Sequence, residues 1–244
     1  MPSALPPLTS GEKTKTPWCS VIIPTLNEER YIGATLQRLT EAPQTTSFEI
    51  IVADGGSTDA TVAIALRYGA RIVRAARGRA TQLNTGAAAA RGRSFLFLHA
   101  DTLPPPDFAR HFPAEREAPP ACFRLRFQGQ RSSALLRLYS YCTRFDIDAF
   151  RFGDQALWVL RRDFEAVGGY PADWQLLEDN YLVRRLRQHC GGFRILPDAV
   201  TTSPRKYVRN GFAYTQLVYT LLYALYRCGA GQRRLLFLYR ALLQ

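Results

Sequence analysis

Cysteine is sparse in this chain of 244 residues, which contains only five. Their number is odd, they stand far apart in the sequence, and no C-x-x-C pattern occurs. Neither a disulfide framework nor a zinc site is therefore expected. We expect reduced, mostly buried thiols, as in a cytosolic protein. The cysteines are Cys19, Cys122, Cys142, Cys190 and Cys228.

Long apolar runs are also missing. Residues 1–17 are polar and contain prolines, so they lack the apolar region of a secretory signal, and a mobile tail is expected there. The segment from Gly211 to Arg227 is uncharged for about 16 residues, fewer than the ~20 needed to span a bilayer. A buried helix fits this segment. A helix lying at a membrane surface, assisted by Arg227, Arg233 and Arg234, is the alternative.

Two common nucleotide-binding motifs are absent. The chain has no G-x-x-x-x-G-K-[ST] loop and no G-x-G-x-x-G fingerprint, which disfavours ATP hydrolysis and hydride transfer. The formal net charge of +12 suits nucleic acid, an anionic membrane surface or a phosphate-bearing small molecule. The basic residues are mostly scattered arginines without a lysine-rich tail, which weakens the nucleic-acid interpretation.

Apolar runs and helical patterns alternate along the first half of the chain. Predicted strands cover 18–24, 48–53, 71–74 and 95–98, and predicted helices cover 28–39, 58–68 and 81–91. This alternation predicts an α/β fold with a mostly parallel central sheet flanked by helices. The pattern is less regular after Asp101. There the predicted strands are 121–127, 156–160 and 193–196, and the predicted helices are 132–145, 162–167, 178–188 and 211–227.

The most informative segment is Asp54-Gly55-Gly56-Ser57-Thr58-Asp59, which joins a predicted strand to a predicted helix. Ligands of open α/β sheets bind where the carboxyl ends of the strands meet. Asp54 stands at such an end and can accept hydrogen bonds from a base or a sugar. Ser57 or Thr58 can cap the following helix. A strand–helix turn with good capping residues and no ligand is the competing interpretation.

Acidic residues recur at three predicted strand ends. Pro24-Thr25-Leu26-Asn27-Glu28 follows the first strand, Asp54 the second, and His99-Ala100-Asp101 the fourth. In a parallel sheet these ends share one edge, and converging carboxylates suit Mg²⁺ or Mn²⁺ bound with a nucleoside diphosphate. Asp101 is the best candidate metal ligand. A strand end followed by a helix cap is the alternative for this last segment.

Taken in order, these segments resemble the family 2 glycosyltransferases of the GT-A (Rossmann-like) fold. The resemblance is strong over 18–101 and looser to about 205. The stretch Gly78-Arg79-Ala80-Thr81-Gln82-Leu83-Asn84-Thr85-Gly86, with H-A-D in place of D-x-D, is most similar to a small bacterial-type subgroup labelled arsenosugar-biosynthesis or carotenoid-type glycosyltransferases.

The resemblance implies roles for individual residues on the donor side. The residues expected to line the nucleoside pocket are Pro24, Asn27, Glu28 and Asp54. Arg79 and Asn84 would lie near the phosphates or the donor sugar. Asp101 would hold Mn²⁺ or Mg²⁺. His99 replaces the first acidic residue of the family motif and would bind the metal or the donor sugar.

The resemblance also implies roles on the acceptor side. Asp179 of the Glu178-Asp179 pair would be the general base that takes a proton from an acceptor hydroxyl. Acidic residues also simply favour the first turn of a helix. Asp154 and Gln155 would contact the acceptor or the donor sugar, or merely form a turn. Arg205 and Lys206 would close over the diphosphate as a lid, or form a solvated face. The Q-x-x-R-W motif of processive members is absent.

The sequence therefore predicts an inverting, metal-dependent, non-processive transferase of the hexosyltransferase type. It would move a sugar from a nucleoside diphosphate sugar, by family habit a UDP-sugar, to a hydroxyl of a small molecule or lipid. The expected organisation is a tail (1–17), a catalytic domain (18–207) and a C-terminal helical extension (208–244). The expected location is cytoplasmic, with peripheral contact at the inner face of a membrane left open. The alternatives are a nucleotidyltransferase, and a basic lipid- or nucleic-acid-binding module with a degenerate nucleotide site.

Overall fold

One mixed sheet forms the centre of the molecule. The computed structural model describes residues 16–43, 47–112, 118–129, 133–151 and 153–243, so most of the predicted N-terminal tail lies outside the described residues. The strands are β1 (Cys19–Thr25), β2 (Phe48–Asp54), β3 (Arg71–Arg74), β4 (Ser94–Phe97), β5 (Thr102–Leu103), β6 (Ala121–Phe127), β7 (Leu157–Leu160) and β8 (Arg194–Thr202). Their order in the sheet is β3-β2-β1-β4-β7-β6-β8-β5.

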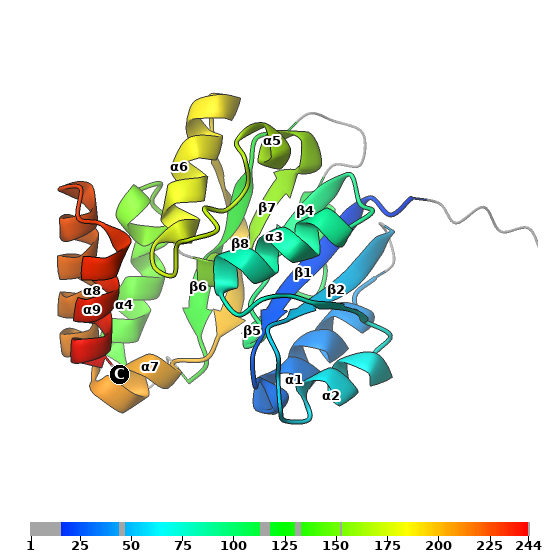
Figure 1. The fold of residues 1–244 in the computed structure, drawn as a ribbon, viewed down its shortest axis with the longest axis horizontal. Coiled ribbons are helices and arrows are strands. Elements are labelled where there is room, and N and C mark those ends of the chain that lie inside the picture. The colour runs from blue at the N-terminus through cyan, green and yellow to red at the C-terminus, as the bar shows by residue number, and fades with distance from the viewer. Residues whose placement is uncertain (1–15, 44–46, 113–117, 130–132, 152, 244) are drawn as a thin grey trace, which may run out of the picture.

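Helices flank this sheet (Figure 1). The helices are α1 (Glu29–Thr40), α2 (Thr61–Arg67), α3 (Arg79–Ala89), α4 (Ala134–Cys142), α5 (Arg161–Ala166), α6 (Glu178–Cys190), α7 (Arg205–Asn210), α8 (Phe212–Arg227) and α9 (Gln232–Leu243). Short 3₁₀ turns are η1 (Phe108–His111), η3 (Asp148–Phe150) and η4 (Gly153–Gln155). The predicted α/β fold class is confirmed.

The two halves of the sheet differ in strand direction. Strands β1, β2, β3 and β4 pair in parallel, as expected for strands joined by crossover helices. β7 runs antiparallel to both β4 and β6, and β5 runs antiparallel to β8. Because β1, β2 and β4 run in the same direction, their carboxyl ends meet at one edge of the sheet.

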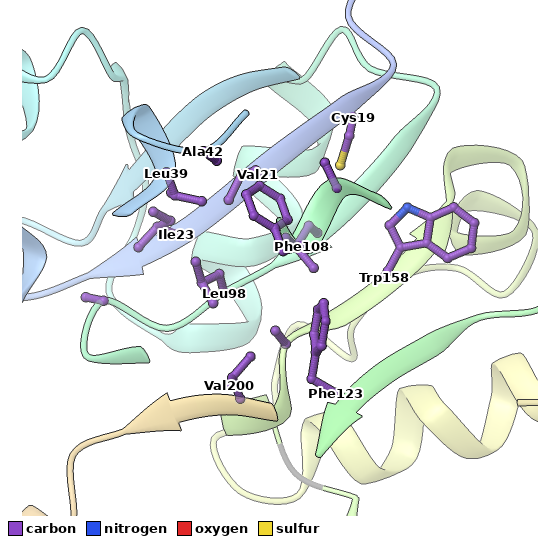
Figure 2. Packing of buried hydrophobic residues seen from close by; sticks show 14 of the residues in the cluster. Cys19, Val21, Ile23, Leu39, Ala42, Leu98, Phe108, Phe123, Trp158 and Val200 are labelled. Atoms are coloured by element: carbon purple, nitrogen blue, oxygen red, sulfur yellow. The ribbon is translucent and has the colours of Figure 1, made fainter. Parts of the chain in front are cut away.

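Both faces of the sheet are buried. Val21 and Ile23 of β1 belong to a large apolar cluster with α1, η1, β6 and Trp158, while Ile22 points into a second cluster with α3, α5 and α6. This is the alternation that a strand covered on both sides requires. Figure 2 shows the first cluster, in which Phe123 extends from β6 and Phe108 lies near Val21 of β1. The buried strands thus hold the shared edge rigidly.

The C-terminal helices form a small layer of their own beside α4 (Figure 1). Val218 and Leu222 of α8 pack with Leu235 and Leu243 of α9. The remaining faces of α8 and α9 are exposed, including Leu217 and Phe237. α8 is therefore buried along one side and open along another. In the described parts of the chain, every helix is too short or too polar to span a bilayer.

Several element boundaries differ from the predictions for identifiable reasons. Neither Ser57 nor Thr58 caps α2, which begins at Thr61 after Ala60, because the Ser57 hydroxyl donates to Asp54 instead. α3 begins at Arg79 because Gly78, at φ 139°, ends the preceding turn. β8 continues past Leu196 to Thr202, because a register shift opposite Cys122 and Arg124 accommodates Pro197.

Candidate functional site

Asp54 ends β2 directly beside the last residue of β1. The Thr25 hydroxyl donates to one Asp54 carboxylate oxygen at 3.0 Å, and the N–H groups of Gly56 and Ser57 donate to the other at 3.0 and 2.9 Å. Burial alone raises the pKa of Asp54, but these bonds and that of the Ser57 hydroxyl outweigh it, so the pKa is lowered. Asp54 is an ionised carboxylate that fixes the turn.

Hydrogen bonds join the loop after β1 to this turn. Asn27 adopts a left-handed backbone at φ 56°, and its side-chain oxygen accepts from the Thr58 N–H at 2.8 Å. The Asn27 N–H donates to the Ser57 hydroxyl at 2.9 Å, and the Glu28 N–H donates to the Thr61 hydroxyl at 2.8 Å. The two predicted nucleoside segments therefore form one structure, with Pro24 beside Ala53 at its base.

Arg79 connects the start of α3 to the start of α6. Its guanidinium contacts the buried Glu178 carboxylate and donates to Asp179 Oδ2 at 2.7 Å. Its other terminal nitrogen lies 3.5 Å from His99 Nε2. Two buried carboxylates thus share one guanidinium. Burial raises the pKa of Asp179 to about 6; Arg79 opposes this shift, whereas Glu178 adds to it.

Asp101 follows β4 and contacts α7 through Arg205. Arg205 Nε lies 3.3 Å from Asp101 Oδ2, and its two terminal nitrogens donate to the Glu28 carboxylate at 3.0 and 2.9 Å. The guanidinium also lies over the Tyr31 ring, 5.1 Å from its centre. Burial raises the pKa of Asp101, partly offset by Arg205. The predicted lid residue is therefore placed against two predicted donor-side residues.

His99 is a neutral imidazole in this environment. Burial lowers its pKa well below the ordinary value, and the positive charges of Arg79, Lys206 and Arg205 lower it further. A neutral imidazole has a free lone pair on one ring nitrogen, which can bind a metal or accept a hydrogen bond.

These residues border a cavity of about 230 Å³. Its polar walls include Arg79, His99, Asp101, Gly153, Asp154, Thr202 and Ser203. The other walls are Phe127 at the end of β6, Leu176 and Leu177 before α6, the residues Arg205, Lys206 and Leu222 of α7 and α8, and a tyrosine wall made of Tyr139, Tyr207, Tyr219 and Tyr239. The cavity thus places charged groups and neutral phenols around one space.

Asp154 borders the cavity, whereas Asp179 lies behind Arg79. Burial, together with the nearby negative charges of Asp179 and Asp101, raises the pKa of Asp154 to about 7. Asp179 is 4% exposed, and a Cβ on Gly153 would lie 2.5 Å from its carboxylate. Only glycine fits at that position, so the loop carrying Asp154 packs directly on Asp179.

Two further predicted site residues, Asn84 and Gln155, form hydrogen bonds within the protein. The Asn84 amide donates to the Tyr170 carbonyl at 2.8 Å and accepts from the Tyr170 N–H at 3.0 Å, so it fastens a loop to α3. Gln155 is 1% exposed, and its side-chain oxygen accepts from Arg151 at 2.7 Å. The polar groups of both side chains are occupied by the protein, and neither residue lines the cavity.

The sequence interpretation missed other residues at the site. Gln82 is buried, and its amide donates to the carbonyls of Thr25 and Ala53 at 2.7 and 2.8 Å, which fixes the ends of β1 and β2. Its presence within the G-R-A-x-Q-x-N-x-G stretch was the available signal. The tyrosine wall was also missed. Its tyrosines come from four helices, and the periodicity of one helix does not identify its neighbours.

The donor atoms at the cavity fit a divalent cation. Asp101 offers a carboxylate oxygen and His99 a neutral nitrogen, a mixture that Mn²⁺ accepts and that Mg²⁺ accepts less readily. The Arg205 contact at 3.3 Å occupies one Asp101 oxygen, so a cation there would replace that guanidinium.

A second group of metal-binding residue types lies at the other end of α6. Ligand atoms of Asp163, His189 and Cys190 lie within 4.8 Å of one another. Arg162 Nε is 3.6 Å from the same Asp163 carboxylate and already supplies a positive charge. This group is separate from the cavity.

Comparison with known proteins places these features in a family. The model described as Glycosyl transferase family 2 matches residues 20–160. Dolichyl-phosphate beta-glucosyltransferase of Drosophila melanogaster is 38% identical over 99 residues, which cover 34% of this chain and 30% of that enzyme. The chain thus matches less than a third of the length of this relative.

Solved structures share the fold at low identity. A mannosyltransferase from Pyrobaculum calidifontis in complex with GDP-Man and Mn²⁺ aligns over 94% of this chain and 69% of its own, with a TM-score of 0.65 and 20% identity. Staphylococcus aureus TarS with UDP-GlcNAc aligns over 76% and 58%, with a TM-score of 0.61 and 19% identity. Glucosyl-3-phosphoglycerate synthase of Mycobacterium tuberculosis, with Mn²⁺ and UDP, aligns over 88% and 81%, with a TM-score of 0.58 and 20% identity.

Proposed function

Because the chain belongs to glycosyl transferase family 2, we propose that it transfers a sugar from a nucleoside diphosphate sugar to an acceptor hydroxyl. The main support is the cavity in which His99, Asp101 and Asp154 converge with the Arg79–Asp179 pair. A binding module without chemistry gives no reason to gather several buried carboxylates beside two arginines. The carboxylates cost desolvation energy that a bound cation would offset.

The donor would bind along the ends of β1 and β2. Ionised Asp54 and the joined loops around Asn27 and Glu28 would frame the base and ribose. Arg79 and Arg205 would face the diphosphate, and both guanidinium groups already border the cavity. A UDP-sugar is the first donor to test. We propose membership of the arsenosugar or carotenoid subgroup on the stretch from Gly78 to Gly86 and on His99-Ala100-Asp101 in place of D-x-D.

A divalent cation would be held by Asp101, with His99 as the second protein ligand. When bound, such a cation neutralises charge that develops on the leaving diphosphate. Displacement of Arg205 from Asp101 would free its guanidinium for the same phosphates. In this proposal, the predicted lid residue Arg205 would exchange its contacts with Glu28 and Asp101 for contacts with the diphosphate.

Asp179 would act as the general base. The acceptor hydroxyl oxygen would form a bond to the anomeric carbon as the bond from that carbon to the diphosphate breaks, with inversion. The hydroxyl proton would pass to the Asp179 carboxylate. Asp179 now lies behind Arg79, at 2.7 Å. Attraction of Arg79 towards the diphosphate would expose this carboxylate to the acceptor only when the donor is in place.

A lipid acceptor at a membrane surface is the finer proposal for localisation. The exposed apolar side chains of Leu217 and Phe237 lie on α8 and α9, near Arg233 and Arg234. Apolar groups beside basic ones suit an interface with anionic headgroups. The partly matching relative acts on dolichyl phosphate by name, which agrees with a lipid acceptor. The alternative to this proposal is transfer to a small-molecule acceptor in the cytoplasm.

Thermal unfolding with nucleotides tests the donor proposal. The protein would be heated with UDP, GDP, CDP or dTDP, each with and without Mn²⁺. One nucleotide at about 100 times its Kd should stabilise the fold by about 2.7 kcal/mol, and this gain should depend on Mn²⁺. Asp101→Ala should lose the Mn²⁺-dependent part, whereas Asp107→Ala, at an exposed site away from the cavity, should keep it. If no nucleotide stabilises folded protein, a lipid- or nucleic-acid-binding module becomes the better account.

A further inference from the structure

Three cationic side chains line the cavity, and two of them are already neutralised. Arg79 contacts Glu178 and Asp179, and Arg205 contacts Glu28 and Asp101. Lys206 is the third, and within the described residues no carboxylate lies within ion-pair distance of its ammonium group. Lys206 is exposed, and its charge acts on the carboxyls of Asp101 and Asp154 without forming an ion pair with either, so the ammonium group is available to an anion from outside.

The neighbours of Lys206 are phenols. Its ammonium nitrogen lies 5.8 Å from the centre of the Tyr219 ring and 5.5 Å from that of Tyr239. Burial alone lowers the pKa of Lys206, but its interactions with these two tyrosines outweigh it, and the pKa is raised. Burial raises the pKa of Tyr219, so this phenol keeps its proton and can donate a hydrogen bond. An anion beside Lys206 would therefore meet a full positive charge and O–H donors.

The rest of this side of the cavity is apolar. Tyr207 packs edge-on against Phe127 with ring centres 5.3 Å apart, and Tyr139 lies against Phe127 at 6.0 Å. Leu222 and Leu176 complete the lining. These side chains present rings and methyl groups beside the ammonium group of Lys206. That combination suits a molecule with an apolar body and an anionic group.

We propose that Lys206, with the phenols of Tyr219 and Tyr239, binds an anionic group, phosphate or carboxylate, on the acceptor, whose apolar part lies against Phe127, Tyr139 and Tyr207. The proposal rests on the proposed transferase function, since it defines the class of acceptor. The positive charge of Lys206 lowers the pKa values of His99, Asp101 and Asp154, so these groups lie close to Lys206. An anion bound by Lys206 would therefore lie beside the proposed reacting groups. Lys206 then serves the acceptor, and the two arginines serve the donor.

Binding of three matched small amphiphiles tests this assignment. Geranyl phosphate, geranate and geraniol share one apolar body and differ in charge. Calorimetric titration of the full chain should give a Kd for at least one of the two anions about tenfold lower than that for geraniol. The stronger anion identifies phosphate or carboxylate. Equal binding of geraniol and both anions, or no binding of either anion, overturns the proposal.

Variants separate the acceptor role from a donor role. Lys206→Met should raise the Kd of the preferred anion to that of geraniol, while Lys206→Arg retains most of the preference. The Kd of UDP with Mn²⁺ should stay within about twofold in both variants. Arg209→Met, an exposed cation on the same helix, is the matched control and should change neither Kd. Loss of UDP binding in Lys206→Met would instead assign Lys206 to the donor diphosphate and overturn the proposal.

The two proposals fail in different ways. If no nucleotide binds but the anion preference and its dependence on Lys206 persist, the donor assignment is wrong and the anion site remains. If UDP binds with Mn²⁺ but Lys206→Met leaves the anion preference unchanged, only the anion site is wrong. Should Lys206→Met not fold, the comparison of the three ligands in the wild-type chain still decides whether the site prefers an anion.

Discussion

The proposed donor side and the proposed acceptor side are built differently. The proposed donor side consists of loops that leave the parallel strands β1, β2 and β4, and its charged groups form ion pairs and hydrogen bonds within the protein. The proposed acceptor side takes its aromatic rings and Lys206 mainly from α4, α7, α8 and α9. A rigid edge thus faces a layer of helices. The first suits a ligand common to many enzymes, and the second suits one that varies between them.

The largest expected effect comes from the residue between the two sides. Asp179→Asn should lower the transfer rate by about 10²–10⁴, because an amide cannot accept the acceptor proton. The Kd of the nucleotide with Mn²⁺ should change little, since Arg79 keeps Glu178 as a partner. Single-turnover rates and nucleotide titration measure the two quantities separately.

Glu165→Gln is the control for Asp179→Asn. It removes an exposed carboxylate on α5 that pairs with Arg161 and does not line the cavity. Turnover of Asp179→Asn near the wild-type rate would end the base assignment. It would direct attention to Asp154, the carboxylate that borders the cavity.

A smaller effect, on stability and its pH dependence, is expected at Asp154. The pKa of Asp154 is near 3.8 in the unfolded chain and about 7 in the folded chain. Burial and the charges of Asp179 and Asp101 raise it, and the charges of Arg79 and Lys206 oppose this rise. The folded state therefore binds more protons between these values, and stability falls as the pH rises through them. Asp154→Asn removes this loss. It should be more stable than wild type by at least about 1 kcal/mol at pH 8, and the difference should shrink towards pH 4.

Thermal unfolding from pH 4 to pH 8 measures this difference. Asp173→Asn, at an exposed carboxylate near α6, should follow the wild-type curve at every pH and serves as the control. If the stability difference between Asp154→Asn and wild type were the same at pH 4 and pH 8, the pKa of Asp154 would not be raised in the folded chain. Water would then reach the Asp154 carboxyl.

The sequence located the strand ends better than it located the tyrosine wall, for a physical reason. Parallel strands covered on both faces are continuous apolar runs, so the ends at Asp54 and Asp101 could be located, and the topology alone brings such ends to one edge. The tyrosine wall has no such rule. Tyr139 and Tyr239 stand 100 positions apart on separate helices, and only tertiary packing makes them neighbours.

Even on the donor side, side-chain partners were harder to predict than positions. Ser57 was expected to cap α2 but donates to Asp54, and Asn84 was expected near the phosphates but binds the Tyr170 backbone. Both residues have short polar side chains that satisfy whichever backbone or side-chain group lies nearest. A motif therefore indicates where polar residues lie in the fold. Their contact partners follow from the tertiary structure.

The smallest expected effect concerns the hydrogen bonds that join the donor loops. Ser57→Ala removes the donor to the buried Asp54 carboxylate and the acceptor for the Asn27 N–H, and water can replace the serine at the exposed Asn27. Unfolding free energy should fall by about 1 kcal/mol, and the Kd of the nucleotide should rise a few-fold. Binding of geranyl phosphate should not change, because Ser57 is not among the cavity-lining residues. Thr40→Ala, which removes an exposed hydroxyl at the end of α1, supplies the baseline for a surface hydroxyl. If Ser57→Ala weakened both ligands equally, the donor and acceptor sides would be one coupled unit, since a change confined to one loop system would then have altered the other.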